Sequence, residues 1–216
     1  MGLEMSNEVK IIYEKLYNRY GDLFWWPANS PYEVIVGAVL TQNTNWNNVE
    51  KAIINFDEKL TPEYILDSEH KDLINIIRPA GFFNQKAAYL KAVTEWFKRY
   101  DYDVDTVKNE PMQKIRDELL AVKGIGKETA DSILLYAFNF PTFVIDAYTI
   151  RLCKRYPINT DMDYDNLKAF FEGNLLKKYE IYNNYHAMIV INGKNHCKKK
   201  SECTGCPLED LCMELR

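Results

Sequence analysis

The sequence predicts an all-α protein, and three observations lead to that class. Apolar residues recur at three- and four-residue steps along most of the chain, which is the spacing of one helix face. The single long apolar run has no neighbouring segment with the alternation of a strand. Prolines stand between the periodic segments, where helices start or stop. We find neither an internal repeat nor a low-complexity tract.

The first predicted helix spans residues 7–19. Val9, Ile12 and Leu16 fall on one face of it and predict an amphipathic helix. Residues 25–31 read Trp-Trp-Pro-Ala-Asn-Ser-Pro, and the two prolines mark a break before the next element.

The apolar run at residues 32–41 could be a buried strand or a buried helix. Small Gly37 and Ala38, and the lack of strand partners nearby, favour a helix. Pro141 ends one of the later helices. The further predicted helices are residues 45–56, 61–67, 71–77, 84–99, 110–121, 127–139, 147–156, 164–178 and 182–192.

Composition limits the class of protein. The 216 residues are 47% hydrophobic and 27% charged, as in ordinary soluble domains, and no apolar run reaches the roughly 18 residues of a membrane span. The polar N-terminus does not resemble a secretory signal. The net charge of −4 argues mildly against a nucleic-acid partner, so a DNA-binding surface must concentrate positive charge locally. We expect a cytoplasmic monomer, which would associate with the nucleoid through DNA if it carries such a surface.

Four of the five cysteines lie near the C-terminus, at Cys197, Cys203, Cys206 and Cys212. Four thiolates in so short a segment suit either a [4Fe–4S] cluster or a structural zinc ion. His196 is a possible substitute ligand, so a zinc ion remains an alternative. The cluster of cysteines indicates a metal site in a reducing compartment and not a disulfide scaffold.

A second motif, Leu-Ala-Val-Lys-Gly-Ile-Gly-Lys-Glu-Thr-Ala, ends at residue 130. Gly124 and Gly126 lie between two helical patterns and allow the backbone to approach a ligand. The free N–H groups of the following helix could bind a DNA phosphate, with Lys123 and Lys127 adding charge. An ordinary turn between two helices is the alternative.

Asp146 follows an apolar stretch and precedes a predicted helix. Taken alone, this position is that of a helix N-cap.

The hairpin, Val-Ile-Asp146 and the terminal cysteines, in this order, resemble the helix-hairpin-helix DNA glycosylases of the endonuclease III superfamily. The resemblance covers about residues 28–212. It implies a six-helix barrel over residues 24–138, and a second helical domain of residues 1–23 and 139–216 that holds the cysteines. Asp146 would face the hairpin across a cleft. The implied partner is double-stranded DNA with a damaged base.

In that family the residue at the Asp146 position is the catalytic carboxylate, which stabilises the sugar as the base departs. Bifunctional members carry a lysine two positions after the second hairpin glycine, where this chain has Glu128. Lys127 is one residue early, which turns its side chain by about 100°. We therefore expect a DNA glycosylase, a hydrolase in base excision repair, without AP lyase activity. Glu128 could also be only a solvated acid in a first helical turn.

The resemblance is closest to the 3-methyladenine glycosylase III branch of monofunctional alkylpurine glycosylases, which shares Trp-Trp-Pro, Leu-Thr-Gln-Asn-Thr and Lys-Gly-Ile-Gly-Lys-Glu. It implies a base pocket of Trp25 or Trp26, Trp46 and Glu128. An N3-alkylated purine is cationic, and a cation on tryptophan gains on the order of 1–2 kcal/mol. Tryptophans in a plain hydrophobic core are the alternative.

The resemblance also implies DNA contacts. Gln42 would fill the gap left by the flipped base, and Phe82 would be the wedge between neighbouring base pairs, with Phe83 packed in the core. The family favours iron–sulfur at the cysteines, although its usual first gap is six residues and here it is five. The expected phosphate contacts are Lys123, Gly124, Gly126, Lys127, Thr129, Asn84, Lys86, Lys198, Lys199 and Lys200.

Two other functions stay open. One is a mismatch-specific thymine/uracil or adenine glycosylase, which the tryptophan pair disfavours without excluding it. The other is a non-catalytic helix-hairpin-helix DNA-binding or electron-transfer protein, in which Asp146 would be only a helix cap.

Overall fold

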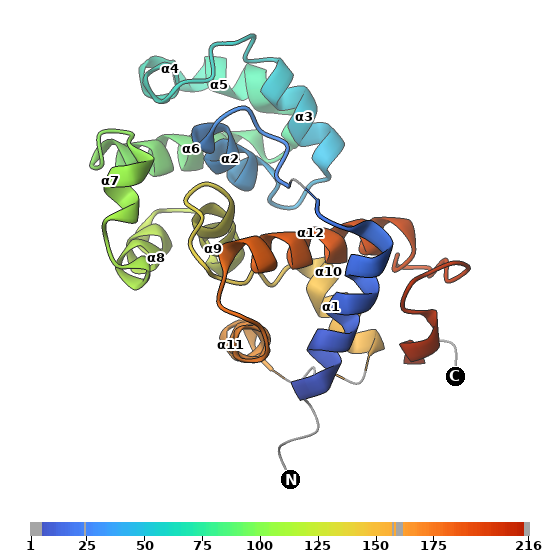
Figure 1. Cartoon of the computed structure of the whole chain (residues 1–216). Coiled ribbons are helices and arrows are strands. Elements are labelled where there is room, and N and C mark those ends of the chain that lie inside the picture. The colour runs from blue at the N-terminus through green and yellow to red at the C-terminus, as the bar shows by residue number, and fades with distance from the viewer. Residues whose placement is uncertain (1–5, 24, 157, 159–161, 214–216) are drawn as a thin grey trace. The chain divides into compact units, whose positions relative to one another are not determined.

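The prediction of an all-α protein is confirmed. The computed structural model describes residues 6–23, 25–156, 158 and 162–213, and these form twelve α-helices and two short 3₁₀ helices, with no strand among them (Figure 1). Within the described residues, no helix combines the length and the apolarity that crossing a membrane requires.

The chain divides into two compact units, and we describe each by itself. Unit 1 consists of Met1–Trp25 and Pro141–Arg216, and unit 2 consists of Trp26–Phe140. We expected the six-helix barrel to span residues 24–138. Unit 2 begins and ends two residues later, at 26 and 140.

Unit 2 is built around α2 (Pro31–Leu40), which packs against α6 (Phe83–Lys98) and α9 (Lys127–Tyr136). The apolar run is therefore a helix. Ser30 caps its start and Pro31 occupies its first turn, and it is apolar on all sides because it is buried within the unit. The other elements are α3 (Trp46–Ile54), α4 (Pro62–Asp67), α5 (His70–Ile77), η1 (Arg78–Ala80), α7 (Val104–Lys108) and α8 (Met112–Ala121).

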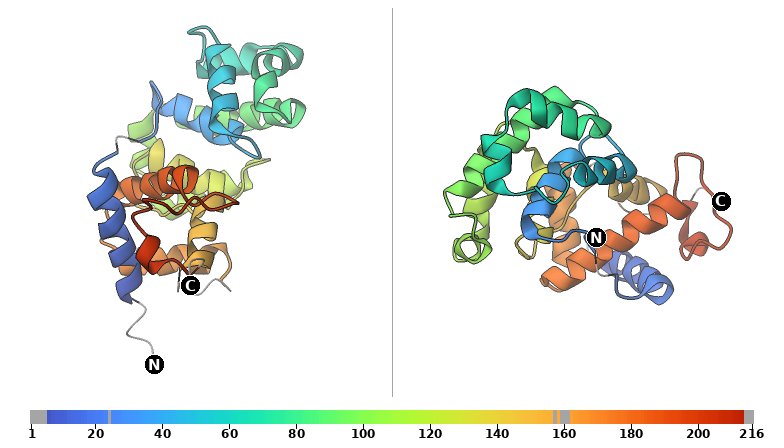
Figure 2. Two further views of the ribbon diagram at one scale, coloured as in Figure 1. Left: turned by 90° about the vertical axis from the view of Figure 1, so that its right-hand side faces the viewer. Right: turned by 90° about the horizontal axis from the view of Figure 1, so that it is seen from above.

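Unit 1 joins the two ends of the chain. Helix α1 (Ser6–Tyr20) and α10 (Ala147–Arg155) both pack against α12 (Tyr179–Asn195), and Figure 2 shows α1 and α12 side by side. Its core contains a stack of Phe143 on Phe171, with ring centroids 4.6 Å apart. The remaining elements are α11 (Tyr164–Asn174) and η2 (Glu209–Leu211).

Several helices start or end away from the predicted residues, and α9, for example, ends at Tyr136 against 139. The helix expected over residues 164–178 ends at Asn174, where Leu175 is extended, and α12 starts three residues earlier than expected, at Tyr179 against 182. Helix α7 was not predicted. It has only five residues, which are too few for an apolar spacing to repeat. Its one local signal is the N-cap Asp103.

Candidate functional site

The glycine-rich hairpin of unit 2 connects α8 to α9. Gly124 has φ +87°, and a β-carbon added there would overlap the Tyr89 ring, so glycine is required for both reasons. Gly126 has an ordinary φ of −94° and open space around it. Lys123 and Lys127 are exposed at the hairpin and at the start of α9. This turn can present backbone N–H groups and two cations to an anion.

Gln42 is fixed to the hairpin by its side-chain amide. Its Nε2 donates to the Gly124 carbonyl oxygen and to Thr129 Oγ1, each at 3.0 Å. The Thr129 side chain is 7% exposed. The expectation that this side chain contacts a phosphate is therefore corrected, because it is buried and bonded to Gln42.

Phe82 projects from the turn before α6 and is 61% exposed. It has φ +46°, a left-handed conformation that costs a bulky residue roughly 1–2 kcal/mol. Phe83 is half-buried beneath the Arg78 guanidinium, at 4.8 Å from the ring centroid, and Asn84 is exposed. The turn thus holds one large apolar side chain out of the core, in a strained conformation of the kind found at functional sites.

Lys86 is not on the surface. It is 1% exposed, and its Nζ donates to the carbonyl oxygens of Leu40 at 2.8 Å and Ala80 at 2.7 Å. Burial lowers its pKa to about 8. The prediction that Lys86 contacts a DNA phosphate is therefore wrong, since its ammonium is used inside unit 2.

The tryptophans fall in different units. Trp26 belongs to unit 2 and lies edge-to-face on Trp46 with centroids 5.2 Å apart, and its indole N–H is buried without a hydrogen bond among the described residues. Trp25 belongs to unit 1, where Lys194 Nζ lies 5.5 Å from its ring centroid. Glu128 is exposed in the first turn of α9. Trp26 and Trp46 thus form one aromatic pair, and Trp25 is paired with a cation.

Asp146 is the N-cap of α10 in unit 1. Its Oδ1 accepts from the backbone N of Thr149 at 2.7 Å and from Thr149 Oγ1 at 2.9 Å. Its Oδ2 lies 3.5 Å from His186 Nε2, and its side chain is 13% exposed. Burial raises the pKa of Asp146, but the charge and hydrogen bond of His186 and the Thr149 bonds outweigh it, so the pKa is lowered.

This arrangement keeps a carboxylate ionised while it caps a helix. One oxygen serves the cap, and the other faces His186 of α12. An ionised carboxylate in a low-dielectric site can stabilise a positive charge that develops nearby. Sequence reasoning did not find His186, because a single histidine in a mostly apolar helix carries no local signal of its partner.

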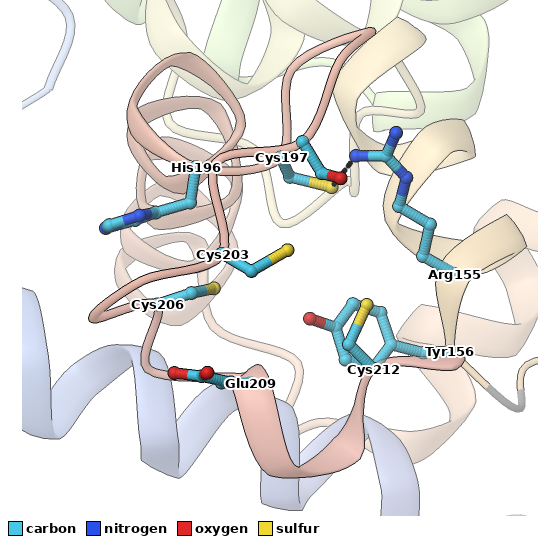
Figure 3. Close-up of a pocket in the computed structure, with 9 residues that line it drawn as sticks. Arg155, Tyr156, His196, Cys197, Cys203, Cys206, Glu209 and Cys212 are labelled. Carbon is cyan, nitrogen blue, oxygen red and sulfur yellow. Dashed lines mark hydrogen bonds between the residues drawn. The ribbon is translucent and has the colours of Figure 1, made fainter. Parts of the chain in front are cut away.

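The four terminal cysteines face one another. Figure 3 shows the sulfur atoms of Cys197, Cys203, Cys206 and Cys212 directed toward a shared space, while the His196 ring points away from it. Among the described residues, no three His, Cys, Asp or Glu side chains close around one point as ligands of a single metal ion.

The groups around these sulfurs are polar. Arg155 is 7% exposed, and its Nη1 donates to Cys197 Sγ at 3.0 Å, as Figure 3 shows. The Nδ1 of His196 lies 3.0 Å from the Glu202 carbonyl oxygen, which gives that ring a partner outside the shared space. Four thiolates with a buried guanidinium beside them therefore form a candidate metal centre.

In the lysine-rich loop between Cys197 and Cys203, one of the three lysine charges is balanced by an acidic residue of the same loop. Lys198 forms an ion pair with Glu202 at 2.8 Å, with both side chains exposed. Lys199 and Lys200 are exposed.

Comparisons with known proteins identify the family of the chain. A family model described as "HhH-GPD superfamily base excision DNA repair protein" matches residues 36–175. A protein of Methanocaldococcus jannaschii, named as a candidate DNA repair glycosylase, is 47% identical over 207 residues, 94% of each chain.

Two solved structures share the fold. The structure of endonuclease III trapped covalently on DNA aligns with a TM-score of 0.82 at 23% identity, covering 97% of this chain and 96% of that one. The H. pylori 3-methyladenine DNA glycosylase bound to 1,N6-ethenoadenine aligns with a TM-score of 0.75 at 30% identity, covering 89% and 98%.

Proposed function

The chain belongs to the HhH-GPD superfamily of base excision DNA repair proteins, and from that premise we propose that it is a monofunctional glycosylase for alkylated purines of the 3-methyladenine type. The observation that carries the proposal is Asp146, an ionised carboxylate with one oxygen fixed by Thr149. The Trp26–Trp46 pair and the carboxylate of Glu128 support the choice of branch.

Asp146 would act on the sugar. As the bond between sugar and base breaks, positive charge develops on the sugar ring, and a carboxylate stabilises that charge. The water that replaces the base gives up one proton to the solvent, and the free base leaves with the electron pair of the broken bond. Oδ2, which faces His186 at 3.5 Å, is the oxygen left for this task, because Oδ1 accepts both hydrogen bonds from Thr149.

Glu128 supports hydrolysis without AP lyase activity. A lyase needs an amine that forms a Schiff base with the sugar. This position in the first turn of α9 carries a carboxylate instead, and carboxylates do not form Schiff bases.

The aromatic pair of Trp26 and Trp46 supports a flipped purine as the substrate. Flipped bases are read by stacking and edge contacts, and the two half-buried rings of this edge-to-face pair offer apolar aromatic surface for stacking. A base that carries positive charge gains a further cation–π attraction of about 1–2 kcal/mol.

The four cysteines would hold a [4Fe–4S] cluster. The support is that the four cysteine sulfurs face one shared space, and that four cysteine thiolates are the usual ligands of such a cluster. When bound, the cluster would cross-link residues 197–212 and hold Lys199 and Lys200 in place for phosphate contact.

The test is base release from methylated duplex DNA, assayed before and after alkali. We expect free 3-methyladenine, strand breaks only after alkali, and no covalent adduct with borohydride. Adduct formation or alkali-independent breaks would refute the absence of lyase activity. Release of thymine or uracil from mismatches, with none from methylated DNA, would identify the mismatch-specific alternative.

A further inference from the structure

Lys86 connects two backbone points that are far apart in the sequence. Its ammonium donates to the last carbonyl of α2, at Leu40, and to the last carbonyl of η1, at Ala80. The last carbonyls of a helix lack donors within that helix, and a cation is favoured at this end of the helix dipole. A buried charge is costly unless its donors are used, and here two of them are.

Each of these carbonyls precedes a residue expected at DNA. Gln42 follows Leu40 by two positions, and Phe82 follows Ala80 by two positions. Lys86 Nζ also lies 6.0 Å from the Phe82 ring centroid. A hollow of about 180 Å³ is lined by Gln42, Phe82 and Lys86, together with Tyr89 and other residues of unit 2.

We propose that Lys86 is a positioning residue that sets the spacing between Gln42 and Phe82, and thereby the geometry with which the two side chains enter the DNA stack. This inference rests on the proposed function. Gln42 is held at its other end by the hairpin, through Gly124 and Thr129. Phe82 is held in a left-handed conformation two residues after the carbonyl of Ala80 that Lys86 binds. Without the ammonium, the end of α2 and the turn before α6 lose their shared anchor.

Lys91 provides a matched control on the same helix. Its Nζ also donates to two carbonyl oxygens, those of Leu66 at 3.1 Å and Ser68 at 2.6 Å. These lie at the end of α4, outside the hollow that Gln42 and Phe82 line. A substitution of Lys91 therefore removes an equivalent anchor without touching the residues expected at DNA.

The experiment compares wild type, Lys86→Met and Lys91→Met as full-length protein, below the unfolding temperature of each. One readout is the fluorescence of 2-aminopurine placed beside the lesion, which rises as the stack opens. The other is single-turnover base release from the same duplex. We expect Lys86→Met to reduce the fluorescence rise and to slow release by roughly 10- to 100-fold, because small displacements of positioning groups carry such costs. Lys91→Met should retain the fluorescence rise and the rate of base release of the wild type.

A second substrate separates positioning from general damage. When the lesion lies opposite an abasic site, less stacking has to be opened, so the defect of Lys86→Met should shrink. Equal losses in both lysine variants, or an unchanged defect on the second substrate, would overturn the inference. Lys86→Gln, which keeps an amide donor, takes the place of Lys86→Met if that variant does not fold.

The two proposals fail separately. DNA opening is measured without base release, so absence of release by the wild type counts against the proposed function alone. An identical fluorescence rise in wild type and Lys86→Met counts against the positioning role alone.

Discussion

In unit 2, backbone carbonyls fix the side chains expected at DNA, whereas in unit 1 four cysteine sulfurs converge beside a buried guanidinium. Gln42 and Lys86 each donate to carbonyl oxygens of their own unit. Unit 2 should therefore be ordered by itself, while the cysteine loop of unit 1 should depend on a metal centre. Under the proposed function, unit 2 would grip and open the DNA, and unit 1 would carry the carboxylate and the metal centre.

The largest expected effect is loss of a cysteine. Cys206→Ser should abolish the metal centre and destabilise unit 1, because metal-binding energy is folding energy for such a loop. Iron and sulfide content, visible absorbance and thermal unfolding measure this. Cys153→Ser is the control, since Cys153 is a buried core residue that does not line the shared space. Unchanged stability of unit 1 after loss of the metal would remove the contrast between the units.

Next is Asp146→Asn, which should slow base release by on the order of 100-fold or more while DNA binding is kept. The amide still caps α10, because asparagine is as good an N-cap as aspartate. Asp163→Asn is the matched control, since Asp163 caps α11 through the same type of bond, to Asn166 at 2.9 Å. Single-turnover release beside a binding titration distinguishes them. Equal activity of both variants would mean that Asp146 is only a cap.

The hairpin of unit 2 gives a smaller effect. Gly124→Ala should destabilise the protein by roughly 1–3 kcal/mol, because the residue has positive φ and its β-carbon would overlap Tyr89. Gly126→Ala should cost much less, since it has an ordinary φ and open space. Denaturant unfolding measures both. Similar losses would show that the Tyr89 contact does not set the glycine requirement.

The smallest effect is a pH dependence that belongs to Lys86. Its pKa is lowered from about 10.5 to about 8, so the unfolded chain binds this proton more tightly. The free energy of unfolding should therefore rise with pH between these values, by about 1–3 kcal/mol. Lys86→Met should lose this rise, and Lys91→Met should keep it. A rise that persists in Lys86→Met would assign it to another group.

The sequence by itself determined the helical class and the local chemistry. The apolar spacing, the cap at Asp146 and the glycine hairpin are local features, and each depends on residues within about one helical turn. The same local reasoning could not find α7, because its five residues are too few for an apolar spacing to repeat.

Only the tertiary structure decided which polar groups are buried and what they bind. Lys86 and Thr129 are predicted from the sequence to contact phosphates, yet both side chains are buried, and each bonds to a residue more than forty positions away, Lys86 to Leu40 and Thr129 to Gln42. His186 meets Asp146 across forty residues in the same way. Trp25 and Trp26 are adjacent in sequence but belong to different units. The burial of a side chain and the choice of its partners depend on long-range packing, which cannot be predicted from a local sequence pattern.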